Sequence, residues 1–199
     1  MPAPPLLTKR LLLRQWKDSD LPLFAKMNAD ARVMKYFPSR LSKEESDSLA
    51  KKIQKELREK EYGLWAVEVI GAAPFIGFLG LHYRDFPAPF TPCIEIGWRL
   101  VYEHWGKGYA FEAAEKVVEY AFNTLKLKEI VSFTTPDNKR SWNLMRKLGM
   151  NHNPEDDFYH TKLPKDHPLG FHVLYRKRNP NEKHESSQIL SPTQKNIEA

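Results

Sequence analysis

The chain has 199 residues, of which 41% are hydrophobic and 28% are charged, so it can build a packed core and global disorder is excluded. Its only cysteine, Cys93, excludes an intrachain disulfide and a zinc site built from cysteines. The net charge of +6 suits a polyanionic partner such as nucleic acid or a phosphate-rich small molecule, and it equally suits a merely soluble basic surface.

The first third of the chain predicts one strand and two helices. Apolar alternation over 11–14 indicates the strand, and apolar residues on one helical face over 21–28 indicate the first helix. Ser42 and Glu45 have the spacing of a capping box, and leucine or isoleucine then recurs at every fourth position over 49–57. The second helix is therefore amphipathic and mostly solvated.

The next segment is rich in aromatic and branched residues and predicts strands. Residues 64–70 and 75–83 form a hairpin around a turn at 71–74. Residues 85–92 contain three prolines and are expected to be a loop, and 94–101 form another strand.

The last structured part alternates helix and strand. Apolar residues over 110–125 follow the i, i+3, i+4, i+7 pattern throughout, which predicts a long helix. A short strand is expected at 129–134, a helix at 139–148 that ends at Gly149, and a final strand at 171–176.

This order of elements predicts a mixed α/β layer structure with one strand–helix–strand crossover through 94–134. We expect a single domain over residues 1–178. Residues 179–199 have few large apolar side chains, so we expect a flexible polar tail.

The turn that joins the strand to the long helix carries the clearest chemical signal. Gly106 and Gly108 let peptide N–H groups approach a ligand, the helix start adds positive potential, and Lys107 can add a charge. This combination favours a phosphate group. A P-loop pattern is absent, and Phe111 breaks the dinucleotide-binding pattern. The alternative is a tight turn whose glycines serve only its geometry.

The sequence resembles the GCN5-related N-acetyltransferases (GNAT), specifically the RimJ/RimL-like branch of ribosomal-protein N-terminal acetyltransferases. The resemblance covers about residues 11–176. It rests on an ordered set of segments: Ile94-Glu-Ile-Gly-Trp-Arg-Leu100, Trp105-Gly-Lys-Gly-Tyr-Ala110 with Glu112-Ala-Ala114, and Asn138-Lys-Arg-Ser141 through Lys147-Leu-Gly-Met150.

The resemblance implies a central, mixed but mostly antiparallel sheet flanked by helices, with acetyl-CoA as cosubstrate between two splayed neighbouring strands. The pantetheine arm would run along Leu100 and Val101 and contact Asn138, whose other possible role is a helix N-cap. The pyrophosphate would lie on the amides of Trp105, Gly106, Lys107, Gly108, Tyr109 and Ala110.

Two positions depart from the family pattern. Many relatives carry Arg or Gln three residues before the first glycine of the turn, where this chain has Glu103. Relatives often protonate the leaving thiolate with a tyrosine seven residues after the motif asparagine, where this chain has Met145. We therefore expect weaker electrostatic attraction of the coenzyme's phosphates. We also expect a group other than residue 145 to protonate the leaving thiolate.

For the general base we favour Glu95, which matches a strand glutamate used by some relatives, and burial would raise its pKa usefully. The alternative is a surface carboxylate on an outward strand face. His82, Asp157 and His160 are weaker candidates for the base. Ser141 matches a serine proposed to protonate the thiolate in the closer branch; a capping hydroxyl and water are the alternatives.

The histidines and aspartates of 152–172 match no familiar metal-ligand spacing, and no metal is expected. Through the resemblance, this segment helps to wall the acceptor site. The same role is open to Tyr36 and Phe37, for which core packing is the alternative.

The leading hypothesis is an acetyl-CoA-dependent N-acetyltransferase that acts on a primary amine of a protein N-terminus or a small molecule. The alternatives are a non-catalytic coenzyme A binding module and a basic nucleic-acid-binding protein, for which no recognition motif is present. No apolar run suits a signal peptide or a membrane span, so we expect a cytoplasmic protein. The acceptor's identity and the choice between monomer and homodimer stay open.

Overall fold

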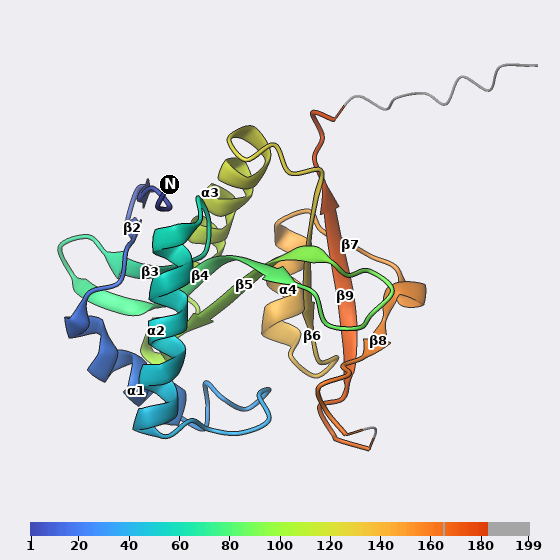
Figure 1. Cartoon of the computed structure of the whole chain (residues 1–199), viewed down its shortest axis with the longest axis horizontal. Helices are drawn as coiled ribbons and strands as arrows, with labels where there is room; N and C mark the ends of the chain where they lie inside the picture. The colour runs from blue at the N-terminus through green and yellow to red at the C-terminus, as the bar shows by residue number, and fades with distance from the viewer. Residues whose placement is uncertain (165, 183–199) are drawn as a thin grey trace, which may run out of the picture.

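Residues 1–164 and 166–182 are described by a computed structural model of the chain. Its strands are β1 Leu6–Leu7, β2 Leu11–Arg14, β3 Leu64–Val69, β4 Ala73–Arg84, β5 Cys93–Leu100, β6 Glu129–Thr134, β7 Asn151–His152, β8 Phe158–Tyr159 and β9 Phe171–Arg178. The α-helices are α1 Leu21–Ala29, α2 Lys43–Glu59, α3 Tyr109–Asn123 and α4 Lys139–Lys147. The strands form one sheet in the order β1-β2-β3-β4-β5-β6-β9-β7, with β8 paired to β9 (Figure 1).

The sheet is antiparallel except where β5 meets β6. These two parallel strands share one register pair, Glu95 with Val131, and the hydroxyl of Ser132 donates to the carbonyl of Ile96 at 2.9 Å. Beyond this point the residues from Gly97 onward pair with β4 alone. The predicted splayed neighbours in a mixed, mostly antiparallel sheet are therefore confirmed.

Helices cover both faces of the sheet (Figure 1). Phe24 of α1 packs edge-to-face on Phe78 of β4, at 5.9 Å between ring centroids. Tyr120 of α3 packs in the same way on Trp65 of β3, at 5.9 Å, and Trp65 lies opposite Leu79. Because neighbouring residues of β4 point to opposite faces, α1 and α3 lie on opposite sides of the sheet. Contacts with their neighbours place α2 with α1 and α4 with α3.

The long elements lie where the sequence predicts them, and the short strands β1, β7 and β8 are additional. The capping box at the start of α2 is present in full, since the Ser42 hydroxyl accepts from the N–H of Glu45 and the Glu45 carboxylate from the N–H of Ser42. Two-residue strands carry too little periodicity to be seen in a sequence.

The predicted bounds of the domain, residues 1–178, and the predicted tail at 179–199 stay predictions. Asn179 still packs on the body, where its side-chain amide donates to the carbonyls of Phe122 and Leu127. The part of the predicted tail at 183–199 lies outside the described residues. Across the helices of the described chain, none has both the length and the apolar character that a bilayer span needs.

Candidate functional site

The turn between β5 and α3 is shaped by two glycines in the left-handed region. Gly106 has φ +74° and Gly108 has φ +80°, a conformation that side chains rarely adopt. A Cβ at Gly106 would meet nothing within 4 Å, so the requirement there is conformational rather than steric. A Cβ at Gly108 would come within 3.3 Å of the Arg10 guanidinium. Gly108 then serves as the N-cap of α3 without any side chain to cap it.

This geometry leaves a row of peptide donors free. The first helical bond is donated by Glu112 N–H to the carbonyl of Gly108. In the part of the chain that the structure describes, the six N–H groups from Gly106 to Phe111 donate no hydrogen bond. The first three of these residues, Gly106, Lys107 and Gly108, are exposed. Such a row at a helix start is a binding site for an anion with several oxygens, such as a diphosphate.

An N-terminal brace, made of Thr8, Arg10 and Glu112, holds the turn from one side. The Glu112 carboxylate accepts from the Thr8 hydroxyl at 2.6 Å and from Arg10 Nε at 2.6 Å and N–H at 2.8 Å. Arg10 Nη1 also donates to the carbonyl of Lys107 at 3.0 Å, and its guanidinium lies 4.6 Å from the Tyr109 ring centroid. Burial alone would raise the pKa of Glu112, but the hydrogen bonds of the brace outweigh it and lower that pKa.

At the exit of β5, peptide groups on the side from which β6 has parted have no ladder partner on that strand. The N–H of Val101, just past the end of β5, donates to the carbonyl of Ile76 in β4 at 2.9 Å, and the carbonyl of Val101 accepts from the N–H of His104. Ladder bonds alternate along the strand, so the N–H groups of Trp98 and Leu100 point toward β6. Sequence reasoning named Leu100 and Val101 and missed Trp98, because this alternation is visible only once the register is known.

Trp105 stabilises the turn through two hydrogen bonds, so its own N–H is not free to bind a phosphate. Its N–H donates to the carbonyl of Tyr102, and its indole Nε1 donates to the carbonyl of Leu100 at 2.8 Å. The guanidinium of Arg140, in the first turn of α4, lies 5.2 Å from the Trp105 ring centroid. This contact brings the start of α4 against the coenzyme turn predicted from the sequence.

Asn138 and Ser141 stand at that start of α4. The Asn138 side chain makes no cap hydrogen bond; its amide donates instead to Thr134 Oγ1 at 2.9 Å. Ser141 is partly buried, and its N–H donates to the carbonyl of Asn138. The hydroxyl of Thr135, beside them at the end of β6, is buried and has no partner among the described residues. Polar groups therefore line β6 where it faces the exit of β5.

Glu95 is buried, at 8% exposure, so the alternative of a surface carboxylate is wrong. It lies on β5 one residue before the strands part, and its Oε2 accepts from Arg84 Nε at 2.5 Å. Burial raises the pKa of this carboxyl, while the charge and hydrogen bond of Arg84 oppose the shift. Its Oε1 lies 3.9 Å from where a Cβ on Gly97 would be, and nothing else lies within 4 Å of that point.

The weaker candidates for the base have structural partners. His82 lies opposite Glu95 in the register, and its Nδ1 is 3.3 Å from Glu56 Oε2 without hydrogen-bond alignment. Burial lowers the pKa of His82. Asp157 accepts from His152 and from the N–H of Leu174.

His160 and His172 belong to an aromatic cluster with Phe86 and Phe158. The His160 ring stacks on Phe86 at 4.5 Å between centroids, and His172 stacks on Phe158 at 5.5 Å. Burial lowers the pKa of His160 to about 4 and also lowers that of His172. Over residues 1–164 and 166–182, no three His, Cys, Asp or Glu side chains gather as a metal would require.

The two departures from the family pattern have structural explanations. Glu103 is paired with Arg32 Nη2 at 3.1 Å, and the Arg32 guanidinium lies 4.1 Å from the Tyr102 ring centroid. Its negative charge therefore faces a cation from the loop after α1. Met145 is fully buried in the core and cannot reach a ligand.

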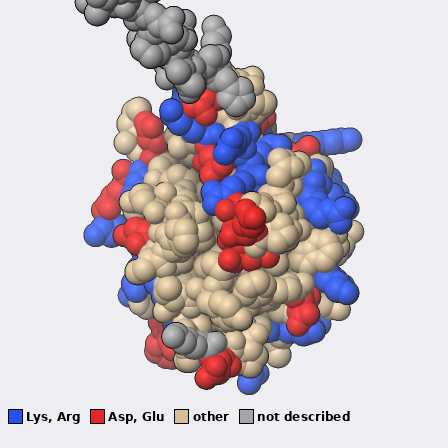
Figure 2. Space-filling model, turned by 90° about the vertical axis from the view of Figure 1, so that its right-hand side faces the viewer, with Lys and Arg blue, Asp and Glu red and all other residues tan. Residues whose placement is uncertain are grey.

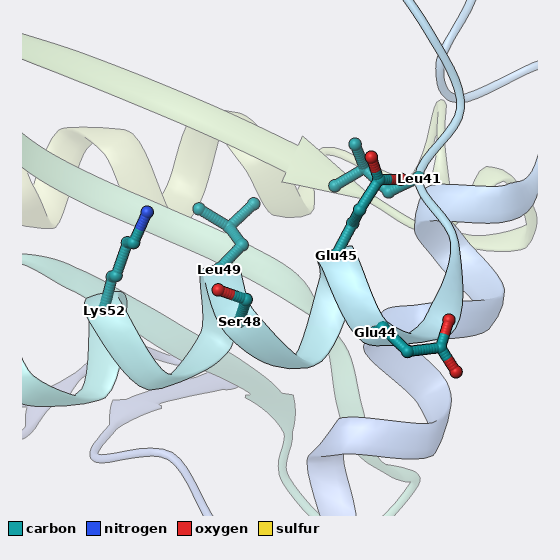
Figure 3. Close-up of a pocket in the computed structure, with 6 residues that line it drawn as sticks. All are labelled: Leu41, Glu44, Glu45, Ser48, Leu49 and Lys52. Atoms are coloured by element: carbon teal, nitrogen blue, oxygen red, sulfur yellow. The ribbon is translucent and has the colours of Figure 1, made fainter.

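Two of the open hollows on the described part of the chain lie outside the turn. One, of about 530 Å³, lies along the start of α2, where Glu45, Leu49 and Lys52 rise from the same side of the helix and Glu45 reaches toward Leu41 (Figure 3). The other, of about 350 Å³, lies between α4 and β7 and includes Trp142 and His152. Neither of these two hollows includes a residue predicted to hold the coenzyme.

The face that carries β9 mixes charges of both signs (Figure 2). Lysine and arginine side chains gather over its upper part, with acidic side chains among and below them. Arg176 on this strand is itself paired with Asp156 at 2.7 Å and Glu129 at 2.8 Å. This face offers no unbroken basic surface for a nucleic acid.

Comparisons with known proteins agree with this geometry. A family model described as an acetyltransferase (GNAT) domain matches residues 10–151. The chain is 30% identical over 161 residues to the uncharacterized N-acetyltransferase YnaD of Bacillus subtilis, covering 79% of this chain and 87% of that one.

Solved structures share the fold. A GNAT-family acetyltransferase from Bacillus anthracis superimposes with a TM-score of 0.72 at 26% identity, covering 88% of this chain and 99% of that one. The ribosomal-protein-S5-alanine acetyltransferase of Vibrio fischeri gives a TM-score of 0.70 at 19% identity, covering 90% and 99%. The family model and the YnaD relative each span most of the chain, which therefore belongs to the GNAT family of acetyltransferases.

Proposed function

We propose that the protein transfers the acetyl group of acetyl-CoA to a primary amine by direct aminolysis of the thioester. The observation that carries this proposal is the row of six free N–H groups from Gly106 to Phe111 at the start of α3. Acetyl-CoA is the donor used by the family, and its diphosphate fits such a row. The residues present therefore suit the coenzyme even though Glu103 replaces a helpful polar group.

The parted strands suit the rest of the coenzyme. The N–H groups of Trp98 and Leu100 face the gap, and one of them can donate to the thioester carbonyl as negative charge develops on its oxygen. Asn138 and the unpartnered Thr135 hydroxyl line the opposite side. Holding the two reactants in this geometry supplies much of the rate.

Glu95 is the proposed base that accepts the proton of the attacking amine, directly or through water. Its raised pKa strengthens it as a base, and Arg84 keeps the carboxylate form available. Ser141 is the proposed donor to the leaving thiolate, because the usual position is the buried Met145. Water is the alternative donor.

The RimJ/RimL-like branch is part of this proposal and rests on the sequence motifs and on the likeness in fold to the Vibrio fischeri enzyme. It leaves two acceptor classes open, protein N-termini and small amines. The cytoplasmic location and the choice between monomer and homodimer stay predictions.

The test is to incubate the protein with acetyl-CoA and a panel of amines and to measure free thiol. We expect thiol release that depends on the amine, together with calorimetric binding of coenzyme A. Binding without thiol release from any amine would favour the non-catalytic coenzyme A module. Displacement of coenzyme A by an oligonucleotide at low salt would favour a nucleic-acid-binding protein.

A further inference from the structure

A partly buried cation, Arg99, lies on the same face of β5 as Glu95. Arg99 is opposite Phe78 in the register, so its side chain lies on the α1 and α2 side of the sheet. Side chains alternate along a strand, so Glu95, Gly97 and Arg99 share that face.

Arg99 has no counter-ion in the part of the chain that the structure describes. Its Nη1 donates to the amide oxygen of Asn28 at 2.7 Å, which is a neutral acceptor. Its Nε is buried and has no partner among those residues. Burial is the cause that lowers the pKa of Arg99 to about 10, with no carboxylate acting to raise it. By contrast, the buried Arg14 has Asp20 and Glu68 within 2.8 Å.

An unpaired buried charge is costly unless something else balances it. The rings of Phe37 and Phe78 supply part of the balance, since the guanidinium lies 3.9 Å and 5.4 Å from their centroids. Stacking on a ring occupies the flat face of a guanidinium and leaves its edge for hydrogen bonds in the plane. That edge has the geometry of a carboxylate receptor.

The space between Glu95 and Arg99 is open. A Cβ on Gly97 would meet only Glu95 Oε1, at 3.9 Å, and no other atom within 4 Å. Glu95 and Arg99 lie four residues apart on an extended strand, which separates their Cα atoms by about 13 Å. A small molecule laid along this strip would have a carboxylate of the protein at one end and an unpaired cation at the other.

We propose that Arg99 binds an anionic group of the acceptor, so that the enzyme acetylates small amines that carry a carboxylate. The amino group lies toward Glu95 and Gly97, and the carboxylate pairs with the free edge of Arg99. This inference rests on the proposed function of acetyl transfer to an amine. It favours amino acids over polyamines, whose second cation would face Arg99.

The turnover test uses a ladder of amines: glycine, β-alanine, 4-aminobutyrate and 5-aminopentanoate, each compared with its methyl ester. A charge-assisted hydrogen bond of ordinary strength gives roughly a tenfold or greater preference in kcat/KM for the acid over the ester. We expect that preference in at least one pair of the ladder. It should vanish in Arg99→Gln and survive in part in Arg99→Lys, with near-ultraviolet circular dichroism confirming that each variant folds.

The binding test requires no turnover. The Nε–H signal of Arg99 is followed by ¹⁵N NMR during titration with acetate and with 5-aminopentanoate, and it is assigned by its loss in Arg99→Lys. We expect a saturable shift with both probes and none with 1-aminopentane. An unmoved signal, an equal response to 1-aminopentane, or esters accepted as well as acids would overturn the proposal.

The two proposals fail in different ways. If no amine releases thiol while the Arg99 signal still saturates with acetate, the acetyl-transfer proposal fails and the anion site stands. If uncharged amines or spermidine are acetylated faster than every carboxylate-bearing amine, acetyl transfer stands and the role of Arg99 is contradicted.

Discussion

The two candidate sites along β5, one at its C-terminal exit and one on its α1 and α2 face, consist of different kinds of chemical groups. At its C-terminal exit, the binding groups are peptide N–H groups of the turn and of the start of α3. On its α1 and α2 face, the groups are the side chains of Glu95 and Arg99, whose character is set by Arg84, Asn28 and Phe37. A backbone site depends on local conformation, whereas a side-chain site depends on partners that lie far away in the sequence.

The largest expected effect lies on the side-chain site. Glu95→Gln removes the proposed base, and loss of a general base costs about 10²-fold to 10⁴-fold in kcat. Coenzyme A affinity should stay unchanged, because the peptide groups of the turn are untouched. Steady-state kinetics and calorimetry measure the two quantities.

The matched control is Glu129→Gln, which also removes an ion-paired strand glutamate but faces Arg176 at the far end of β6. Its kcat should stay close to the unmodified protein's. A small loss of kcat in Glu95→Gln, no larger than in the control, would remove Glu95 from the mechanism.

The second largest effect is expected at the backbone site. It is tested by comparing two glycines that have nearly the same conformation. Gly106 has φ +74° and Gly71, in the turn between β3 and β4, has φ +70°, and a Cβ at either meets nothing within 4 Å. Alanine in the left-handed region costs about 1–2 kcal/mol. Both Gly106→Ala and Gly71→Ala should therefore lose similar unfolding free energy in denaturant titrations.

Only Gly106→Ala should also weaken coenzyme A binding, by up to roughly thirtyfold, because any part of the strain that the turn relieves by rotating must be restored when the N–H row binds the diphosphate. Equal coenzyme affinity in the two variants would mean that the left-handed turn has no part in binding.

A smaller effect should follow from loosening the brace. Arg10→Gln or Glu112→Gln removes charge-assisted bonds that hold the turn, so the KM for acetyl-CoA should rise about threefold to tenfold while kcat changes less. Lys116→Gln is the control, because it breaks an ion pair with Glu119 on the exposed side of the same helix. If kcat falls and KM does not, the brace acts on the chemical step and not on coenzyme binding.

The smallest expected change is a shift in pH dependence. The charge and hydrogen bond of Arg84 lower the pKa of Glu95 against the effect of burial, so Arg84→Gln should raise that pKa further. The base is active when ionised, so activity is lost as the pH falls through this pKa. The acid limb of kcat/KM should therefore move to higher pH, with little change at alkaline pH. A limb that moves to lower pH would contradict the assignment of Glu95.

The same shift has a consequence for stability. The carboxyl of Glu95 has a higher pKa in the folded chain than in the unfolded one, so the folded state binds the proton more tightly. Its contribution to stability is fully present below the ordinary glutamate pKa and is lost as the pH rises through the raised pKa.

Most of the backbone site could be predicted from the sequence. Glycine at positions 106 and 108 before an alanine-rich helix fixes a left-handed turn and a free helix start by local rules alone. The brace could not be predicted, since Arg10 and Glu112 are a hundred positions apart. The hydrogen bond from the Trp105 N–H to the carbonyl of Tyr102 could not be predicted either, because it depends on the detailed shape of the turn.

Less of the side-chain site could be predicted. Alternation along 94–101 places Glu95, Gly97 and Arg99 on one face, but it does not say which face is covered or by what. The burial of Glu95 follows from its central position in the sheet, and the isolation of Arg99 follows from having Asn28 and Phe37 as neighbours in place of a carboxylate. Both are properties of the assembled fold.

The most direct measurement is an amide-resolved NMR titration of the ¹⁵N-labelled protein with coenzyme A. The peptide N–H signals from Gly106 to Phe111 should shift together and saturate with one dissociation constant, while that of Gly71 stays in place. Saturable binding that leaves these six signals unmoved, or no binding at all, would contradict the assignment of the α3 start as the diphosphate site.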